Sequence, residues 1–450
     1  MRIIVRRFIV ILLICLLLPS YAKVDEALDL NKRLSYVNLP FFERFGDEWL
    51  CFYILEAIKN NHEAKSALYK SEQFRYQARI SLAAQFPSFN VQTNYLGIKI
   101  PMLDDNFPIK QNGFILPFEA NYEADLLLKN ADKTKSKKRL YRASLYDEKA
   151  IYIMLASDVA TSYINLLGLD KTILIYQKII KDKEEILART SDKYKFGIIS
   201  KTELNEIKKD LNDKKQELEE TKKQRDTTLN NLTLLVGKSA FCTNDLQRSG
   251  FENFAPDIKV ADAIPSHVIF ERPDVEAALQ RLLSAKIDIT VAKKEFFPSF
   301  NITGFYAFNT IGPGNFFSWR STFAAIIAGA TTDIFKGGEK IANLKLKRAR
   351  YKELLENYFH TDLKAIKEIS DALYKINYDE KILKEAQEKY LAQKENYRLE
   401  KLRNKEGVSD DVALLRESAE LSDNEKNYTT KRVQKFIDII SLYKSTGGAL

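Results

Sequence analysis

The sequence predicts a mostly helical protein with a few membrane-type β-strands, built as a tandem duplication of one large unit. Two matching phrases, which end at Tyr95 and Tyr306, lie 211 residues apart, and strand-like alternation follows the start of each phrase. Long segments without proline follow the strands in both halves. Farther along the chain the offset is 210 residues, and it pairs Gly197 with Gly407, Leu204 with Leu414, and Gly237 with Gly447.

The length and composition favour one elongated body over a row of independent domains. Only 16 glycines and 11 prolines occur in 450 residues, so most of the chain is expected in long helices. We expect a first repeat over residues 23–237, a linker over 238–265 and a second repeat over 266–450.

The N-terminal segment 1–22 has the pattern of a secretory signal peptide. Three arginines precede an apolar core at 8–18, and Ser-Tyr-Ala at 20–22 forms a small-x-small cleavage site. Cys15 lies within leucines and isoleucine, so we do not expect lipidation. A bilayer-spanning helix needs about 20 apolar residues. No other segment reaches that length, so the mature chain is expected to cross a membrane only with strands.

Charge and reactive side chains argue against several functions. The formal net charge of +9 comes from lysines interleaved with glutamates, which is typical of solvated helical faces and not of nucleic-acid binding. His62, His267 and His360 are scattered, and no nucleophile or phosphate-binding motif occurs. We therefore expect no enzyme activity, no cofactor and no metal. Cys51 and Cys242 remain after signal cleavage, and their pairing is left open.

The first pair of strands is predicted over about 88–97 and 115–128. Apolar and polar side chains alternate from Leu116 to Leu126, a run with the length of a tilted membrane strand. A polar face of this kind suits the water-filled interior of a barrel, although a soluble antiparallel sheet would show the same alternation. The candidates for pore-facing residues here are Asn90, Gln92, Asn94, Glu119, Asn121, Glu123 and Asp125.

The second pair of strands is predicted over about 299–309 and 322–335. The first of these repeats the alternation and adds Asn301 and Thr303 to the pore-facing candidates, whereas the second is less polar. Loops rich in proline, glycine and asparagine, 98–113 and 310–321, would join the paired strands. Four strands cannot close a barrel, and lipid forbids open strand edges. Other copies of the chain would therefore complete it.

The remaining segments of each repeat predict long paired helices. A helix from Lys336 to about Asn404 would extend roughly 100 Å at 1.5 Å per residue. In the helix that follows, five residues, mostly leucines, lie seven positions apart, which is the spacing of a coiled coil. Five residues of the equivalent helix in the first repeat have the same spacing. These positions are Leu204, Leu211, Leu218, Arg225 and Leu232, and then Leu414, Leu421, Tyr428, Lys435 and Leu442.

The tips between paired helices carry turn and cap signals. A glycine in the left-handed conformation would end the first helix, and Ser200 with Glu203 forms a capping box that starts the next. Asp410 and Asp411 in the first turn of the last helix would complement the helix dipole. They have two open interpretations, capping alone or a ring at a pore constriction. The tip candidates are Gly197, Ser200, Glu203, Gly407, Ser409, Asp410 and Asp411.

These residues give the chain a resemblance to the TolC-like outer-membrane efflux factors, over nearly the whole mature length. It is most similar to the branch that serves resistance-nodulation-division pumps. The strongest match is the phrase Glu-Arg-Pro-Asp-Val-Glu-Ala-Ala at 271–278, followed by Phe-Phe-Pro-Ser at 296–299. Further matches lie at 39–47, 57–61, 195–200, 234–237 and 333–338.

The resemblance implies a homotrimer in the outer membrane, with a 12-stranded barrel, four strands from each chain, continued by a long α-helical barrel into the periplasm. It implies a passive exit duct that lies in outer-membrane lipid and contacts a periplasmic adaptor. It also implies an inner-membrane pump of the resistance-nodulation-division type as a partner. Some members carry acidic rings after the second tip glycine. Ala413 and Leu414 occupy those positions here, so the resemblance does not assign a gate to Asp410 and Asp411.

Two alternatives to an efflux duct stay open at this point. One is the exit duct of a type I protein secretion system. The other, from a different class, is a periplasmic coiled-coil scaffold without a pore, which would explain the helices but not four strands of membrane length. The cargo is not specified by the sequence.

Overall fold

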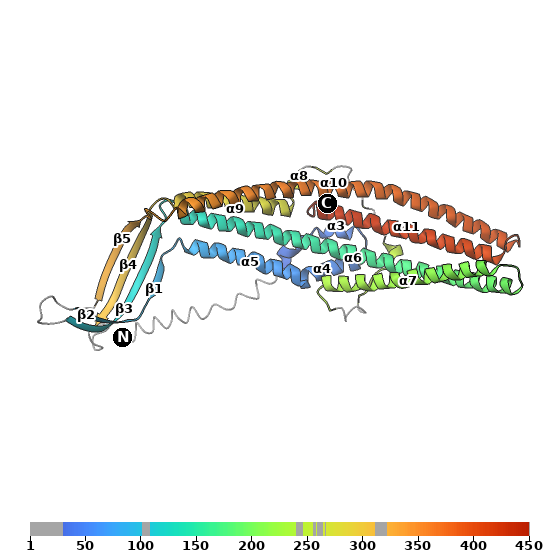
Figure 1. The fold of residues 1–450 in the computed structure, drawn as a ribbon, viewed down its shortest axis with the longest axis horizontal. Coiled ribbons are helices and arrows are strands. Elements are labelled where there is room, and N and C mark those ends of the chain that lie inside the picture. Colours follow the sequence, from blue (N-terminus) through green and yellow to red (C-terminus); the bar gives the residue numbers. More distant parts are fainter. Residues whose placement is uncertain are drawn as a thin grey trace. The chain divides into compact units, whose positions relative to one another are not determined.

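The computed structural model describes residues 30–100, 109–239, 246–254, 258, 264–265, 267–310 and 322–449 (Figure 1). The expected signal peptide, Cys242 and the central parts of both inter-strand loops lie outside these residues. The N-terminal half contains α3 (Leu39–Glu43), α4 (Glu48–Asn60), α5 (His62–Ala83), β1 (Ser88–Val91), β2 (Asn94–Ile100), β3 (Ile109–Ala124), α6 (Lys129–Lys195) and α7 (Lys201–Leu235). The C-terminal half contains η2 (Phe251–Asn253), α8 (His267–Phe270), α9 (Pro273–Lys294), β4 (Ser299–Thr310), β5 (Thr322–Thr331), α10 (Glu339–Lys405) and α11 (Asp411–Ser445).

The element lengths repeat between the two halves, which confirms the duplication. Helices α5 and α9 both have 22 residues, α6 and α10 both have 67, and α7 and α11 both have 35. The starts of α6 and α10 differ by 210 residues, as do those of α7 and α11. The backbone therefore keeps the offset seen in the sequence.

The two repeats do not form separate units. The chain divides into unit 1, which comprises Met1–Leu68, Asp147–Val275 and Asp362–Leu450, and unit 2, which comprises Tyr69–Tyr146 and Glu276–Thr361. Each compact unit takes segments from both repeats, so the boundaries of the units do not coincide with those of the repeats. This happens because α5, α6, α9 and α10 are long enough to contribute to both units.

Residues 39–47, near the N-terminus, pack into the hydrophobic core of unit 1. Phe41 stacks on Tyr443 of α11 with ring centroids 4.4 Å apart, and Phe42 and Phe45 are also fully buried in this cluster. The carboxylate of Asp47 caps α4 and accepts hydrogen bonds of 3.1 and 3.0 Å from the Tyr163 hydroxyl. Segment 39–47, one of the segments that carry the family resemblance, thus packs in the core and caps α4.

The C-terminal ends of α7 and α11, which we call the hairpin roots, are fixed in the same way. The Asn61 side-chain amide donates to the Leu235 carbonyl at 2.9 Å, and the Arg272 guanidinium donates to the Ser445 carbonyl at 2.6 Å. Residues 61 and 272, like residues 235 and 445, are equivalent in the duplication. Helix ends leave carbonyls without helical partners, so each repeat satisfies one from a neighbouring element.

An ion pair is also duplicated within the two hairpins, α6/α7 and α10/α11. Arg225 contacts Asp170 at 3.2 Å in the first, and Lys435 contacts Glu380 at 3.4 Å in the second. The heptad leucines Leu204, Leu211, Leu218, Leu232, Leu421 and Leu442 are buried. Both hairpins therefore pack with the register that the sequence predicts.

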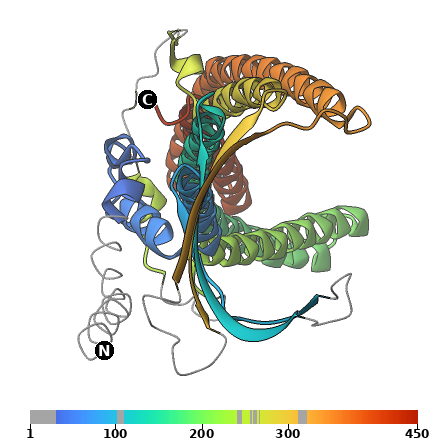
Figure 2. The ribbon, with the colours of Figure 1, turned by 90° about the vertical axis from the view of Figure 1, so that its left-hand side faces the viewer.

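Unit 2 contains a curved antiparallel sheet (Figure 2). Its order is β1-β3-β4-β5, and β2 pairs with β3 beyond the end of β1. Strands β1 and β2 therefore act as one strand interrupted at residues 92–93, and the sheet is four strands wide, as expected. The two repeats meet in the sheet where β3 pairs with β4. Eleven residue pairs join these strands, from Phe114 with Thr310 to Ala124 with Phe300.

The strand bounds differ from the expected ones. β3 begins earlier than expected, and it ends at Ala124 because the Asp125 carboxylate accepts a hydrogen bond of 2.8 Å from the Ala131 amide at the start of α6. Leu128, with φ of 56°, completes this turn. β5 ends at Thr331 and is followed by a turn in which Gly337 and its neighbour have positive φ.

One helix of the described residues, α6, is long and apolar enough to cross a membrane by composition. Within its most apolar stretch, 67% is buried inside the fold. Helix α6 is therefore a core helix by its packing, since a buried apolar stretch is explained by its protein neighbours.

Candidate pore face and helix tips

The polar candidates of the strands share one face of the sheet. Asn90 pairs with Glu119, which pairs with Phe305, and Glu123 pairs with Asn301. Directly paired residues of antiparallel strands lie on the same face. The register also places Asn94 on this face, through its pairing with Ile115. Gln92 lies between β1 and β2, where its amide donates to the Pro117 carbonyl at 3.2 Å.

Side-chain hydrogen bonds connect the two repeats across this face. The Thr303 hydroxyl donates to the Asn121 side-chain oxygen at 2.9 Å, and the Asn121 amide donates to Glu119 at 2.8 Å. Glu123 forms an ion pair of 2.6 Å with Lys129. Asp125 stands apart from this group, because it lies beyond β3 and caps α6. The structure thus brings together the strand candidates and leaves Asp125 at the helix start.

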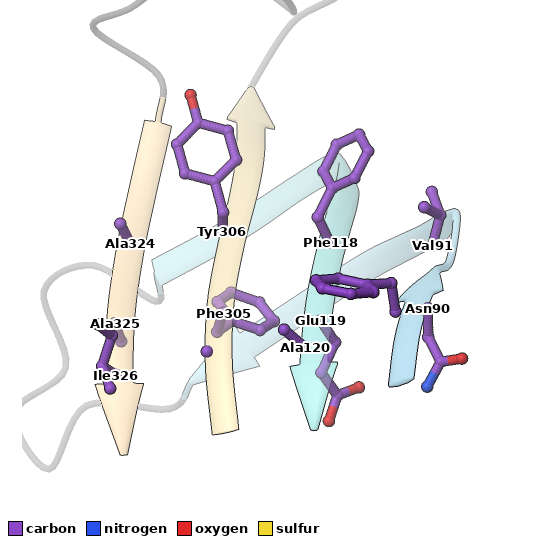
Figure 3. Close-up of a pocket in the computed structure, with 12 residues that line it drawn as sticks. Asn90, Val91, Phe118, Glu119, Ala120, Phe305, Tyr306, Ala324, Ala325 and Ile326 are labelled. Carbon is purple, nitrogen blue, oxygen red and sulfur yellow. The ribbon is translucent and has the colours of Figure 1, made fainter. Parts of the chain in front are cut away.

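The opposite face of the sheet is apolar and exposed in the single chain. A concavity of about 520 Å³ on the sheet is lined by residues of β1, β3, β4 and β5 that belong to both faces, among them Phe89 as well as Asn90 and Glu119 (Figure 3). One row across it joins Phe89, Ala120, Gly304 and Ile326. Phe89 is 79% exposed and Ile326 is 82% exposed. Large apolar side chains at this exposure mark a surface that contacts lipid or another protein.

The polar face also carries an apolar stripe that the sequence pattern did not reveal. Phe305 and Phe323 lie on it with ring centroids 5.9 Å apart, next to Ala325 and Ile327. The irregular alternation of β5 hid this assignment, because apolar side chains stand on both of its faces. Pairing with β4 is what places them.

The first helix tip has the predicted turn. Gly197 has φ of 73°, and its amide bonds to the Tyr194 carbonyl. The Ser200 hydroxyl accepts a hydrogen bond of 3.1 Å from the Glu203 amide, which confirms the predicted cap. Phe196 and Ile198 are exposed at this tip.

The second tip repeats the glycine turn but uses a different cap. Gly407 has φ of 74°, and the N-cap of α11 is Asp410, whose carboxylate accepts from the Ala413 amide at 2.8 Å. Ser409 instead donates its hydroxyl to Glu400 of α10. Asp410 lies 210 residues after Ser200, so the two N-caps occupy equivalent positions in the two repeats.

Ion pairs connect the two tips. Lys193 of α6 contacts Asp410 at 2.8 Å, and Arg189 of α6 contacts Asp411. The Lys193 ammonium, together with the Ala413 amide, lowers the pKa of Asp410. Hydrogen bonds from Asn404 and then Arg189 lower the pKa of Asp411. The sequence pattern does not indicate Arg189 and Lys193, because their partners lie more than 200 residues away.

The chain matches the family described as outer membrane efflux protein over residues 53–238 and 264–448. It belongs to this family. The two matched segments correspond to the two repeats, and the outer membrane efflux protein fold explains why strands and long helices alternate in each.

Individual relatives of this outer membrane efflux protein cover most of the chain. Outer membrane protein OprJ of Pseudomonas aeruginosa is 25% identical over 401 residues, which are 87% of this chain and 82% of the relative. The cation efflux system protein CusC of Escherichia coli K12 is 23% identical and covers 80% of this chain and 78% of its own length. The crystal structure of the Campylobacter jejuni CmeC outer membrane channel has a TM-score of 0.83 and 22% identity, and it covers 92% of this chain and 89% of its own.

The family assignment fixes the coarse function and location. The protein is a TolC-like efflux channel of the outer membrane, with a large helical portion in the periplasm, and the relatives are efflux channels, not enzymes. Within the described residues no group of three histidine, cysteine or acidic side chains could hold a metal ion, and Cys51 is a free thiol whose pKa is raised by burial.

Proposed function

We propose that three copies of this chain close a 12-stranded barrel, which forms the exit duct of a tripartite efflux system. The observation that carries the proposal is the sheet of unit 2, which is four strands wide and has one polar and one apolar face. Its outer strands, β1/β2 on one side and β5 on the other, would leave backbone groups unpaired in lipid. Pairing β5 of one copy with β1/β2 of the next satisfies both edges.

In this arrangement the polar face lines the aqueous passage and the apolar face contacts lipid. Charged groups at a lipid face are costly, and the carboxylates of Glu119 and Glu123 stand on the face opposite Phe89 and Ile326. The chain is a passive duct, and an inner-membrane transporter of the resistance-nodulation-division class supplies the energy. The pore-lining residues are Asn90, Gln92, Asn94, Glu119, Asn121, Glu123, Asn301 and Thr303.

The ion pairs between the tips serve as the entrance gate in this proposal. Lys193 with Asp410 and Arg189 with Asp411 hold the start of α11 against α6. All four side chains are at least two fifths exposed, so each contact is weak and can be broken by a partner that binds the tips. The exposed apolar side chains of Phe196, Ile198 and Val408 would receive the periplasmic adaptor.

Planar bilayers test the duct directly. Purified protein should run as a trimer by native mass spectrometry and should give single-channel conductance. A coiled-coil scaffold would give no conductance, even as a trimer. A conducting assembly of another copy number would contradict the 12-stranded barrel.

Neighbouring residues of β3 test the assignment of the two faces. Glu119→Lys should shift ion selectivity from cations toward anions, because it reverses a charge on the pore face. Ala120→Ser is the matched control on the opposite face and should leave selectivity unchanged. Equal effects of the two variants would mean that Glu119 does not face the passage.

The gate has a separate test. Asp410→Ala combined with Asp411→Ala should raise the single-channel conductance, since both ion pairs between the tips are lost. Asp192→Ala is the control, because Asp192 pairs at 2.9 Å with Lys195 of its own helix. If the double variant conducts like the wild type, the two aspartates only cap α11.

A further inference from the structure

The two hairpins differ at one pair of positions near their roots. In the first repeat Leu169 of α6 and Thr228 of α7 occupy these positions, and 210 residues later stand Asp379 of α10 and Asp438 of α11. Asp438 is only 2% exposed. A buried ionised carboxylate is costly unless it is paired, so this replacement needs a compensating contact.

The contacts around Asp438 satisfy only one of its two oxygens. The Gln434 side-chain amide donates to Asp438 Oδ1 at 2.9 Å. Oδ2 is buried and receives no hydrogen bond from any residue that the structure describes. The carboxyl group of Asp379 lies within hydrogen-bond reach of Asp438. Two ionised carboxylates would repel each other there, whereas one proton between them would supply the missing hydrogen bond.

The surrounding charges only partly oppose protonation. From α10, Asp379 raises and Lys375 lowers the pKa of Asp438, and from α11 the neutral Gln434 lowers it. Lys435, the next basic residue on α11, pairs with Glu380 at 3.4 Å. Burial is the largest cause, followed by Asp379, and the pKa of Asp438 is raised to about 6.

We propose that Asp379 and Asp438 form a proton-binding joint between α10 and α11, which holds this hairpin root together while the two carboxyl groups share a proton and loosens it when the proton leaves. The joint exists in only one of the two repeats. In a trimer, three hairpins would respond to pH and the alternate three would not.

The sign of the response follows from the direction of the pKa shift. The folded protein binds this proton more tightly than the unfolded chain, so the stabilisation is fully present below the ordinary aspartate pKa of 3.8. It is lost as the pH rises from that value through about 6. The root is therefore tightest in acid and looser at neutral pH.

Infrared spectroscopy of the purified full-length protein, with aspartate labelled at the carboxyl carbon, tests the shared proton. The wild type should show the carbonyl band of a protonated aspartate at pH 5, and this band should disappear with a midpoint near pH 6. Asp438→Asn, which keeps the side-chain shape, should lack the band. Fully ionised aspartates in the wild type at pH 5 would overturn the proposal.

Hydrogen exchange tests the mechanical consequence. After correction for the intrinsic rate, amides of residues 375–383 and 434–442 should exchange about tenfold faster at pH 7.5 than at pH 5. Asp379→Leu combined with Asp438→Thr copies the first repeat and should remove this difference. Asp371→Asn, which alters an exposed acid paired with Lys367 at 2.6 Å, should retain it. The same pH response in the double variant would overturn the joint, and Asp438→Asn supplies a folded reference should that variant misfold.

Discussion

The long helices of the two repeats have the same lengths and different chemistry. Each contains helices of 22, 67 and 35 residues, a left-handed glycine at the tip and a fixed carbonyl at the root. The side chains at equivalent positions differ. The root carbonyl accepts from the neutral Asn61 in the first repeat and from the charged Arg272 in the second. The N-cap of the last helix is Ser200 in the first repeat and Asp410 in the second. In the proposed trimer, six hairpins of equal length would form one tube, whereas different side chains are tolerated at the contacts.

The largest expected difference between the repeats lies at the roots. Arg272 is 5% exposed and also bonds Glu368 at 2.7 Å and Asp274 at 2.8 Å, so Arg272→Ala removes several contacts and leaves the Ser445 carbonyl without its donor. We expect a loss of about 3 kcal/mol in the free energy of unfolding. Asn61→Ala should cost about 1–2 kcal/mol, because one hydrogen bond is lost.

Urea titration in detergent, followed by circular dichroism, measures both losses. Arg350→Ala is the control, since Arg350 is exposed and Glu353, on the same helix, is its ion-pair partner among the described residues. Equal losses for Arg272→Ala and Asn61→Ala would mean that charge adds nothing at the second root.

Glycine substitutions compare roots with tips within each repeat. A Cβ at Gly237 would lie 2.8 Å from the Asn60 carbonyl oxygen, and one at Gly447 would lie 2.8 Å from Pro273. At Gly197 and Gly407 a Cβ would meet nothing within 4 Å. All four have positive φ. Alanine should therefore cost about 2–3 kcal/mol at the roots and about 1 kcal/mol at the tips.

Thermal unfolding of the four single variants gives this ranking, with both root variants melting below both tip variants. A tip variant that melts as low as a root variant would show that close approach of the backbone at the root is not the cause.

Removal of the first cap should have a smaller effect. Ser200→Ala deletes the hydrogen bond to the Glu203 amide and should destabilise the start of α7 by about 1 kcal/mol. Hydrogen exchange of the first turn of α7 measures this, and Ser200→Asp, which mimics the cap of the second repeat, should restore protection. Unchanged exchange in Ser200→Ala would show that the turn, and not the cap, holds the helix start.

The ion pairs between the tips should give the smallest change in stability, because their side chains are exposed. The pKa values of Asp410 and Asp411 are lowered, so the contribution of these pairs is present above the unfolded pKa of about 4 and is lost as the pH falls through the lower folded values. Distances between spin labels on α6 and α11 near the tips should be constant from pH 8 to 5, and they should lengthen in stronger acid, as the two carboxylates become protonated, or in 1 M salt.

Lys193→Met should reproduce the acid response of the tips at neutral pH. The tips and the second root then respond to opposite ends of the pH scale, since the pKa of Asp438 is raised and those of Asp410 and Asp411 are lowered. Tips that separate near pH 6 would contradict this contrast.

Local signals made most elements of the fold predictable. Gly197 and Gly407 end the long helices because a glycine adopts positive φ at little cost, and the heptad leucines of α7 and α11 mark the buried side of each hairpin. The alternation in β3 placed Glu119, Asn121 and Glu123 on one face. The ends of β3 and β5 were less predictable, because the turn at Asp125 depends on a contact with Ala131 at the start of the next helix.

The sequence by itself determined the duplication, the lengths of the helices, the turns at the tips and the alternating faces of the strands, because these depend on local spacing and backbone preference. Only the tertiary structure decided that both repeats contribute to each unit, that Arg189 and Lys193 contact Asp411 and Asp410, and that Asp379 meets Asp438. Heptad spacing states which side of a helix is buried, but the partner on that side is set by how distant segments pack.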